Sequence, residues 1–167
     1  MKRAVFLDRD GVINDNKKPV NKPSDFIFFP WTFEALDLII KANFSIFVVT
    51  NQGGIEMGYF TEENLKSIHD YMLEQFMNNN IIIDDVKHCP HFKTHCECRK
   101  PLPGMLNSLS QKYSVDLKSS YMVGDREMDI EAGKKAGCTT IKIGKPSPQA
   151  DYNVSNLLQA AQLIIKI

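Results

Sequence analysis

Two aspartates separated by one residue are the first chemically informative feature of the sequence. Asp8 and Asp10 follow the apolar run 4–7, and Gly11 comes directly after them. Side chains two apart in an extended segment share a face, so both carboxylates can enter one crevice while Arg9 turns away. One carboxylate can then stay ionised as nucleophile and metal ligand, while like-charge repulsion raises the pKa of its neighbour. The alternative is that both aspartates only form a turn.

A third acid follows a later apolar run. Asp125 comes directly after Gly124, and together with Asp8 and Asp10 it supplies the hard oxygen ligands that suit Mg²⁺. Asp129 fits the first turn of a helix, where a carboxylate is favoured by the helix dipole. We interpret Asp129 as a helix cap rather than as a metal ligand.

Groups that bind phosphate follow two further runs. Thr50 offers a hydroxyl, and the amides of residues 51–54 can cradle phosphate oxygens. Arg99 and Lys100 add two cations, the first able to grip an oxyanion with its fork and the second a compact charge that neutralises phosphoryl oxygens. These residue types together predict a site for a phosphorylated small molecule.

Three of the four cysteines, Cys89, Cys96 and Cys98, lie within ten residues of one another. In a reducing compartment this crowding favours metal binding over disulfides, and three thiolates with one imidazole form a closed tetrahedral set for structural Zn²⁺. The nearby histidines that could complete the set are His88, His91 and His95. Such a zinc loop would fold the irregular segment that carries Arg99 and Lys100; the alternative is a cysteine cluster without metal. Cys138 is predicted to be a small core residue.

Apolar runs alternate with helical patterns along the chain. Runs of apolar and β-branched residues predict strands at 4–7, 45–50, 82–88, 121–123 and 139–143. Apolar residues three or four apart predict helices after caps at Thr32 and Thr61, from about residue 103, at 128–136 before Gly137, and at 155–165. This alternation predicts a doubly wound, Rossmann-like α/β domain with a five-stranded parallel sheet.

The predicted strands also indicate where the candidate catalytic side chains lie. Asp8 and Asp10 follow the first strand, Thr50 and Asn51 end the second, and Asp125 follows the fourth. Because ligands of such sheets bind beyond the carboxyl ends of the strands, we expect these side chains to gather at one edge.

Length and charge limit the classes of protein to which this chain can belong. The 167 residues are predicted to form a single domain, 1–167. The 20 basic residues balance the 20 acidic ones, so no basic field favours nucleic acid. The apolar runs are too short for a membrane span or a secretory signal, so we expect a cytoplasmic protein that acts without nucleic acid or membrane. We also expect a monomer.

Four motifs resemble those of the haloacid dehalogenase-like phosphatases: Asp8-Arg9-Asp10-Gly11, Thr50-Asn51-Gln52, Arg99-Lys100-Pro101 and Gly124-Asp125-Arg126. The resemblance extends from Arg3 to Gly144. The segment from Cys89 to Pro101 resembles the zinc-containing branch that includes heptose bisphosphate and histidinol phosphatases. The family implies the sheet order 5-4-1-2-3 for the five predicted strands. Only a short stretch separates Gly11 from Thr32, so we expect no cap domain over the site.

The resemblance also implies roles. Asp8 would be the nucleophile that forms an aspartyl-phosphate, and Asp10 the acid that protonates the leaving alkoxide and then activates water. Thr50 would orient the phosphoryl group, and Lys100 would neutralise it. Mg²⁺ would be held by Asp8, the main-chain carbonyl of Asp10, and Asp125. The expected zinc ligands are Cys89, His91, Cys96 and Cys98, and the expected substrate-binding residues are Asn16, Asn51, Gln52, Gly53, Arg99 and Arg126.

The resemblance favours D-glycero-β-D-manno-heptose 1,7-bisphosphate as substrate, with removal of the 7-phosphate. Histidinol phosphate or another small sugar phosphate is the alternative. A phosphoacceptor signalling domain, from another class, also uses an acidic pair, a threonine and a lysine. Its phosphorylated aspartate follows the third strand, where this sequence has His88 and Cys89. A zinc-stabilised module that binds protein or nucleic acid has no basic face to support it.

Overall fold

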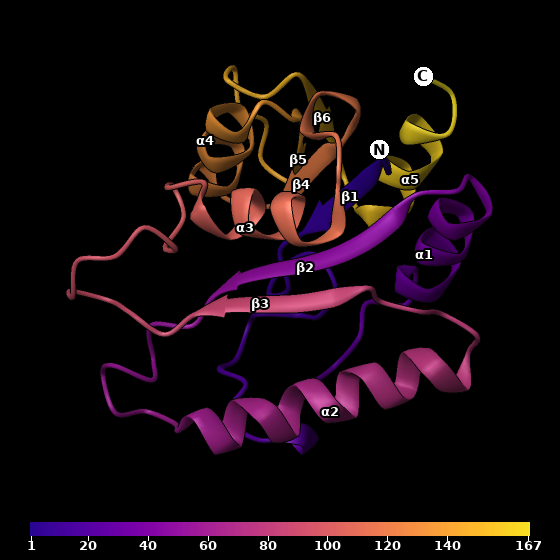
Figure 1. The fold of residues 1–167 in the computed structure, drawn as a ribbon. Coiled ribbons are helices and arrows are strands. Elements are labelled where there is room, and N and C mark those ends of the chain that lie inside the picture. Colours follow the sequence, from indigo (N-terminus) through magenta and orange to yellow (C-terminus); the bar gives the residue numbers. More distant parts are fainter.

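The computed structural model describes residues 1–167, which form one parallel sheet with helices on both faces (Figure 1). The sheet order is β3-β2-β1-β4-β5-β6. The strands are β1 (Ala4–Leu7), β2 (Ser45–Asn51), β3 (Asp85–Cys89), β4 (Tyr121–Gly124), β5 (Thr139–Ile143) and β6 (Tyr152–Val154). The helices are α1 (Thr32–Lys41), α2 (Glu62–Asn78), α3 (Gly104–Tyr113), α4 (Glu127–Ala136) and α5 (Leu157–Ile164), with short 3-10 turns η1 (Pro23–Asp25) and η2 (Leu117–Ser119).

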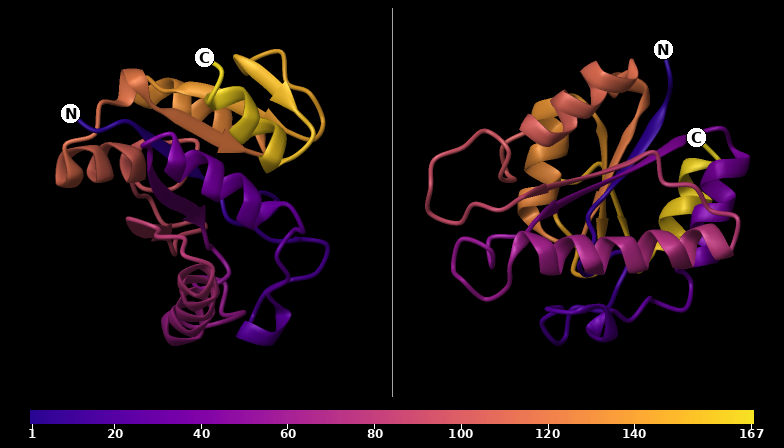
Figure 2. Two further views of the ribbon diagram at one scale, coloured as in Figure 1. Left: turned by 90° about the vertical axis from the view of Figure 1, so that its right-hand side faces the viewer. Right: turned by 60° about the horizontal axis from the view of Figure 1, so that its bottom comes forward.

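Both faces of the central strand β1 are buried, which explains its uninterrupted apolar sequence. Val5 and Leu7 join the core beneath α1, α2 and α5, whereas Ala4 and Phe6 join the core beneath α3 and α4. Figure 2 shows α1 and α5 side by side on one side of the sheet. The two cores fix the sheet from both sides, so the loops at its carboxyl edge extend from a rigid base.

The predicted doubly wound α/β fold is confirmed, with all five predicted strands and their relative order. The prediction of five strands is wrong, because β6 adds a sixth at the edge next to β5. Its three residues, Tyr-Asn-Val, are exposed or half-buried and include a polar centre, so they give no apolar run. The third strand begins at Asp85 rather than at residue 82, since Ile82 is largely exposed.

Two of the predicted helix ends are confirmed and one is wrong. The hydroxyl of Thr61 accepts a hydrogen bond from the backbone N–H of Asn64, and Gly137 ends α4 with a φ of 93°. Thr32, however, is the first residue of α1 and not its cap. Its buried hydroxyl donates to the carbonyl of Ile13 at 2.9 Å, which ties the helix to the loop after β1.

No inserted domain covers the carboxyl edge of the sheet. Residues 8–31 contain only η1, and residues 52–61 form a loop between β2 and α2. None of the helices combines the length and the apolar character that a membrane span requires. The site at this edge is therefore bordered by loops, by the end of β2 and by the first turn of α4, without an inserted domain.

The position of Thr32 gives a test of the fold. We expect Thr32→Asp to lower the free energy of unfolding by roughly 1–3 kcal/mol, because the carboxylate would face the Ile13 carbonyl oxygen inside the core. Thr32→Ser keeps the hydroxyl and serves as the control. Urea unfolding measures both variants. Aspartate is a good N-cap residue, so a stabilised Thr32→Asp variant would show that position 32 caps the helix after all.

Candidate active site

The end of β1 carries the two aspartates in a fixed arrangement. The backbone N–H of Asp8 donates to the carbonyl of Val123 at 3.1 Å, which joins the ends of β1 and β4. Gly11 adopts a φ of 84°, and a Cβ atom there would lie 2.1 Å from Oδ2 of Asp125. Only glycine therefore allows the chain to turn at this point and lets Asp125 approach the first-strand aspartates.

Lys100 is the buried cation of the site, with 1% of its surface exposed. Its Nζ lies 3.0 Å from Oδ1 of Asp8 and 2.7 Å from Oδ1 of Asp129, and it donates to the carbonyl of Val49 at 2.8 Å. Although burial opposes the charge, the two carboxylates raise the pKa of Lys100 above its ordinary value. The ammonium therefore stays protonated between two acids.

Asn51 at the end of β2 explains how the loop after β3 brings Lys100 to this place. Its Oδ1 accepts from the backbone N–H of Lys100, and its Nδ2 donates to the backbone carbonyl of the same residue, both at 3.0 Å. The Asn51 side chain was predicted to bind substrate. In the structure its amide instead clamps the main chain of the lysine, although Asn51 still lines the recess beside it.

Asp8, Asp125 and Asp129 form a cluster in which one oxygen of each lies within 4.8 Å of the others. Burial, together with the charge of Asp129, raises the pKa of Asp8 to about 8 and that of Asp125 above its ordinary value. The buried Oδ1 of Asp125 accepts no hydrogen bond. Three crowded carboxylates with a free oxygen are the donor set that a divalent cation satisfies, so these residues fit Mg²⁺.

Asp129 is a member of this cluster that sequence reasoning assigned only to a cap. It does both: its Oδ2 accepts from the backbone N–H of Arg126 at 3.0 Å, while Oδ1 faces Lys100. Its complete burial could not be read from the sequence. The carboxylate of Asp10, in contrast, does not belong to the cluster, and its proposed part in metal binding concerns its main-chain carbonyl alone.

Asp10 is held by a different set of donors. Its Oδ1 accepts from Nη2 and Nε of Arg9 at 2.9 and 3.2 Å and from Nδ2 of Asn14 at 3.0 Å, while Oδ2 accepts only from Nε2 of Gln52 at 3.1 Å. Burial alone would raise the pKa of Asp10, but Arg9 and these hydrogen bonds lower it below its ordinary value. The pKa of Asp10, the residue assigned the proton, is therefore lowered, and it is the pKa of Asp8 that is raised.

Gln52 connects the second motif to the first. The same Nε2 that reaches Asp10 also donates to Oγ1 of Thr50 at 2.9 Å, and both Thr50 and Gln52 are buried. Gly53 packs against the loop after β3, where an added Cβ would lie 3.1 Å from Nη1 of Arg99. Of these three residues, Gln52 alone lines a hollow of the site, while Thr50 and Gly53 lie behind it.

Two adjoining hollows lie at the carboxyl edge of the sheet. A recess of about 70 Å³ contains Asp8 and Lys100, and an adjoining cleft of about 210 Å³ contains Asn16. Asp10 and Arg126 line both hollows. Residues that sequence reasoning missed are Met128 in the recess and Lys18, Pro19, Val20, Asn21, Tyr59 and Phe60 in the cleft. The loops that carry the cleft residues were expected to control selectivity, but no spacing in them singles out one side chain.

Arg99 lines neither hollow. Its Nη1 donates to the carbonyl of His91 at 2.9 Å, and its guanidinium lies 5.4 Å from the ring centroid of Phe92. In this arrangement Arg99 supports the loop that precedes Lys100.

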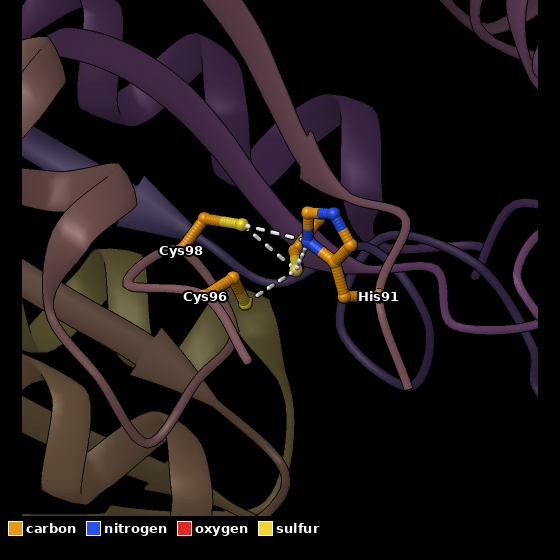
Figure 3. Close-up of side chains that lie close together, drawn as sticks. His91, Cys96 and Cys98 are labelled. Atoms are coloured by element: carbon orange, nitrogen blue, oxygen red, sulfur yellow. Dashed lines mark hydrogen bonds between the residues drawn. The ribbon is translucent and has the colours of Figure 1, made fainter. Parts of the chain in front are cut away.

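The four predicted zinc ligands lie together, one at the end of β3 and three within the loop that follows it (Figure 3). Sγ of Cys89 lies 3.6 Å from Sγ of Cys96 and 2.9 Å from Sγ of Cys98, and Nδ1 of His91 lies 3.5 Å from the sulfurs of Cys89 and Cys98. Zinc bonds of about 2.3 Å to sulfur place tetrahedral ligands roughly 3.8 Å apart, so most of these separations fit and the Cys89–Cys98 pair is closer. The donor set therefore suits Zn²⁺.

The sequence left three histidines open, and the geometry separates them. His91 contributes to the cluster, whereas Nε2 of His88 lies 2.8 Å from Oε2 of Glu62 and His95 is exposed. Burial opposes ionisation of Cys96, but hydrogen bonds that include the backbone N–H of Arg99 lower its pKa to about 6. One thiol of the cluster is therefore predisposed to the thiolate form that binds metal.

A parallel sheet with paired aspartates and a buried lysine at its carboxyl edge defines the class of the HAD-like hydrolases, and a family model described as HAD-hydrolase-like matches residues 97–150. The D-glycero-alpha-D-manno-heptose-1,7-bisphosphate 7-phosphatase of Campylobacter jejuni is 41% identical over 151 residues, covering 90% of this chain and 87% of that protein. The D-glycero-beta-D-manno-heptose-1,7-bisphosphate 7-phosphatase of Escherichia coli K12 is 35% identical over 98% of this chain and 94% of its own length.

A solved structure gives the same result. The D,D-heptose 1,7-bisphosphate phosphatase from B. bronchiseptica, complexed with magnesium and phosphate, superposes with a TM-score of 0.89 at 30% identity over 98% of each chain. This chain therefore belongs to the HAD-like phosphatases, in the family of the manno-heptose-1,7-bisphosphate 7-phosphatases.

The raised pKa of Asp8 predicts how cation binding depends on pH. Below that pKa the metal-free site holds a proton that Mg²⁺ must displace, so the increase in Tm at a fixed Mg²⁺ concentration should grow between about pH 6 and about pH 9. Thermal unfolding with and without Mg²⁺ measures this increase. In Asp8→Asn the growth with pH should be much weaker. In Asp37→Asn, which changes a half-exposed aspartate on α1, it should persist. An equal increase at every pH would contradict the cation site.

Proposed function

We propose that this chain is a Mg²⁺-dependent phosphomonoester hydrolase that removes the 7-phosphate of D-glycero-D-manno-heptose 1,7-bisphosphate through an aspartyl-phosphate intermediate. The observation that carries the proposal is the buried contact between Lys100 and Asp8 at the wall of a recess that also contains Asp10. A nucleophile, a fixed cation and a proton donor thus surround one small space. Phosphoryl transfer asks little else of a protein than such positioning and charge.

In the first half-reaction an oxygen of Asp8 attacks phosphorus while the bond from phosphorus to the sugar oxygen breaks. Lys100 and the backbone N–H of Arg9, which donates to Oδ1 of Asp8 at 2.8 Å, fix the plane of the attacking carboxylate. The departing sugar oxygen takes its proton from Asp10. A Mg²⁺ bound by Asp8 and Asp125 would supply positive charge against the transferring group.

In the second half-reaction Asp10 removes a proton from water, and the resulting hydroxide attacks phosphorus and releases phosphate from Asp8. The lowered pKa of Asp10 keeps its carboxylate ionised and able to accept this proton, but it also makes the carboxylate a weaker base. Its role as an acid requires a proton at Oδ2, the oxygen with a single donor. A phosphate dianion that enters the recess favours this protonation, because nearby negative charge raises the pKa of a carboxyl group.

The charge of the cleft favours a bisphosphate over histidinol phosphate. Lys18 and Arg126 line the cleft, and neither forms an ion pair with a carboxylate. They suit a second phosphate at the far end of a sugar, whereas the ammonium group of histidinol phosphate would meet like charge. The names of the relatives support the same substrate and divide between its α and β anomers.

We expect Mg²⁺-dependent phosphate release that is faster on heptose 1,7-bisphosphate than on histidinol phosphate, with each anomer assayed separately. Asp8→Asn should lower kcat by on the order of 10⁴-fold or more, because no other carboxylate can accept the phosphoryl group. Asp37→Asn is the matched control and should retain full activity. Turnover that survives in Asp8→Asn would reject the mechanism, and a preference for histidinol phosphate would reject the substrate.

We further propose that Cys89, His91, Cys96 and Cys98 hold a structural Zn²⁺. Cys96→Ser should reduce the bound zinc, measured by elemental analysis, from about one ion per chain to a small fraction of that. Activity should fall by roughly 10- to 100-fold, because the loop that positions Lys100 loses its support. Cys138→Ser changes a buried cysteine outside the cluster, and this variant should still contain about one zinc ion per chain. Undiminished zinc in Cys96→Ser would contradict this assignment.

A further inference from the structure

Arg9, between the two catalytic aspartates, is a buried cation whose guanidinium is held from two sides. Only 1% of its surface is exposed. Nε and Nη2 donate to Oδ1 of Asp10 at 3.2 and 2.9 Å, and Nη1 lies 3.1 Å from Nε2 of His69. Arg9 was expected to turn away from the pocket. Its side chain instead grips Asp10 and lines the cleft, so its orientation matters to the site.

His69 reaches Arg9 from α2, an element that contributes no catalytic residue. Its side chain is 8% exposed, and its ring centroid lies 6.4 Å from that of His88 on β3. Burial, followed by the positive charge of Arg9, lowers the pKa of His69 to about 3. The imidazole is therefore neutral, and because the guanidinium can only donate, Nε2 must be the acceptor of the contact.

The geometry at Asp10 indicates what this contact achieves. Three donors occupy Oδ1, two from Arg9 and one from Asn14, whereas Oδ2 accepts from Gln52 alone. A carboxyl group fixed through one oxygen presents the other in a defined direction. If the fork of Arg9 rotated, Oδ1 would lose two of its three donors, and Oδ2 would no longer point reliably at the leaving oxygen.

We propose that His69 is a positioning residue for proton transfer by Asp10, acting through Arg9. The inference rests on the proposed function, in which Oδ2 of Asp10 gives its proton to the sugar oxygen as the phosphorus–oxygen bond breaks. His69 touches neither substrate nor reacting atoms. It fixes Arg9, Arg9 fixes Oδ1, and the orientation of Oδ2 follows.

A second substrate, whose leaving group needs no proton, distinguishes a positioning role of His69 from a general loss of structure. p-Nitrophenolate leaves as a stable anion, whereas a sugar alkoxide requires protonation. His69→Leu should therefore lower kcat/KM on the heptose ester about tenfold, out of the roughly 10²–10⁴-fold that a positioned acid supplies, and should change kcat/KM on p-nitrophenyl phosphate less than about twofold. The ratio kcat/KM is the quantity compared because it reports the first half-reaction alone, whereas kcat also includes the second, in which Asp10 activates water for both substrates. His69→Gln, which offers an acceptor oxygen to Arg9, should restore most of the loss.

Two controls make the test specific. Leu65→Ala removes a buried side chain from the same helix while keeping His69, and it should affect both substrates equally or not at all. In an Arg9→Met background, His69→Leu should change kcat/KM on the heptose ester less than about twofold, because the path from His69 to Asp10 is already broken. Equal losses of kcat/KM on both substrates in His69→Leu, or full additivity with Arg9→Met, would overturn the proposal.

Nitrogen-15 NMR of the His69 imidazole tests its contact with Arg9 directly and does not depend on which substrate the enzyme hydrolyses. The expected tautomer carries its proton on Nδ1 and leaves Nε2 as acceptor at neutral pH, with an Nε2 shift that changes in Arg9→Met. A proton on Nε2 would overturn the inference. Wild-type protein that shows this tautomer but releases no phosphate from the heptose ester would instead reject the proposed function.

Discussion

The buried ammonium of Lys100 is the interaction on which the site depends. It lies between Asp8 and Asp129 with a carbonyl of β2 as its third partner. A buried charge of this kind is strongly destabilising if one partner is lost, so β1, β2, α4 and the loop after β3 must all be in place together. The contacts that hold the lysine therefore also fix the distances between the elements that carry the chemistry.

The loop after β3 can meet this requirement only with support from outside its own sequence. Residues 90–103 form no helix or strand and contribute few buried apolar side chains. Asn51 holds its main chain at Lys100, the carbonyl of His91 holds Arg99, and Gly104 approaches so closely that an added Cβ would lie 2.1 Å from the carbonyl oxygen of Glu97. A metal bound by the cysteine cluster would complete this support at the other end of the loop.

The sequence was most informative where chemistry is tied to strand ends. Parallel strands bring their carboxyl ends to one edge, so the meeting of Asp8, Thr50 and Asp125 could be predicted from three apolar runs. It was least informative where a side chain reaches across the fold. The second partner of Lys100, Asp129, has the spacing of an ordinary helix cap, and the contact of His69 with Arg9 joins residues sixty positions apart. Neither contact leaves a local pattern, and β6 is too short and polar to form one.

Burial raises the pKa of both catalytic carboxylates, and their different partners then separate the two values. Asp10 has a cation of its own in Arg9, and its pKa is lowered. Asp8 shares the single ammonium of Lys100 with Asp129 and lies beside Asp125, and its pKa is raised. Three carboxylates around one ammonium leave an excess of two negative charges, which is the charge of one divalent cation. A cation at that position would favour the ionised form of Asp8 that attacks phosphorus, while Asp10 keeps Arg9 as its own cation.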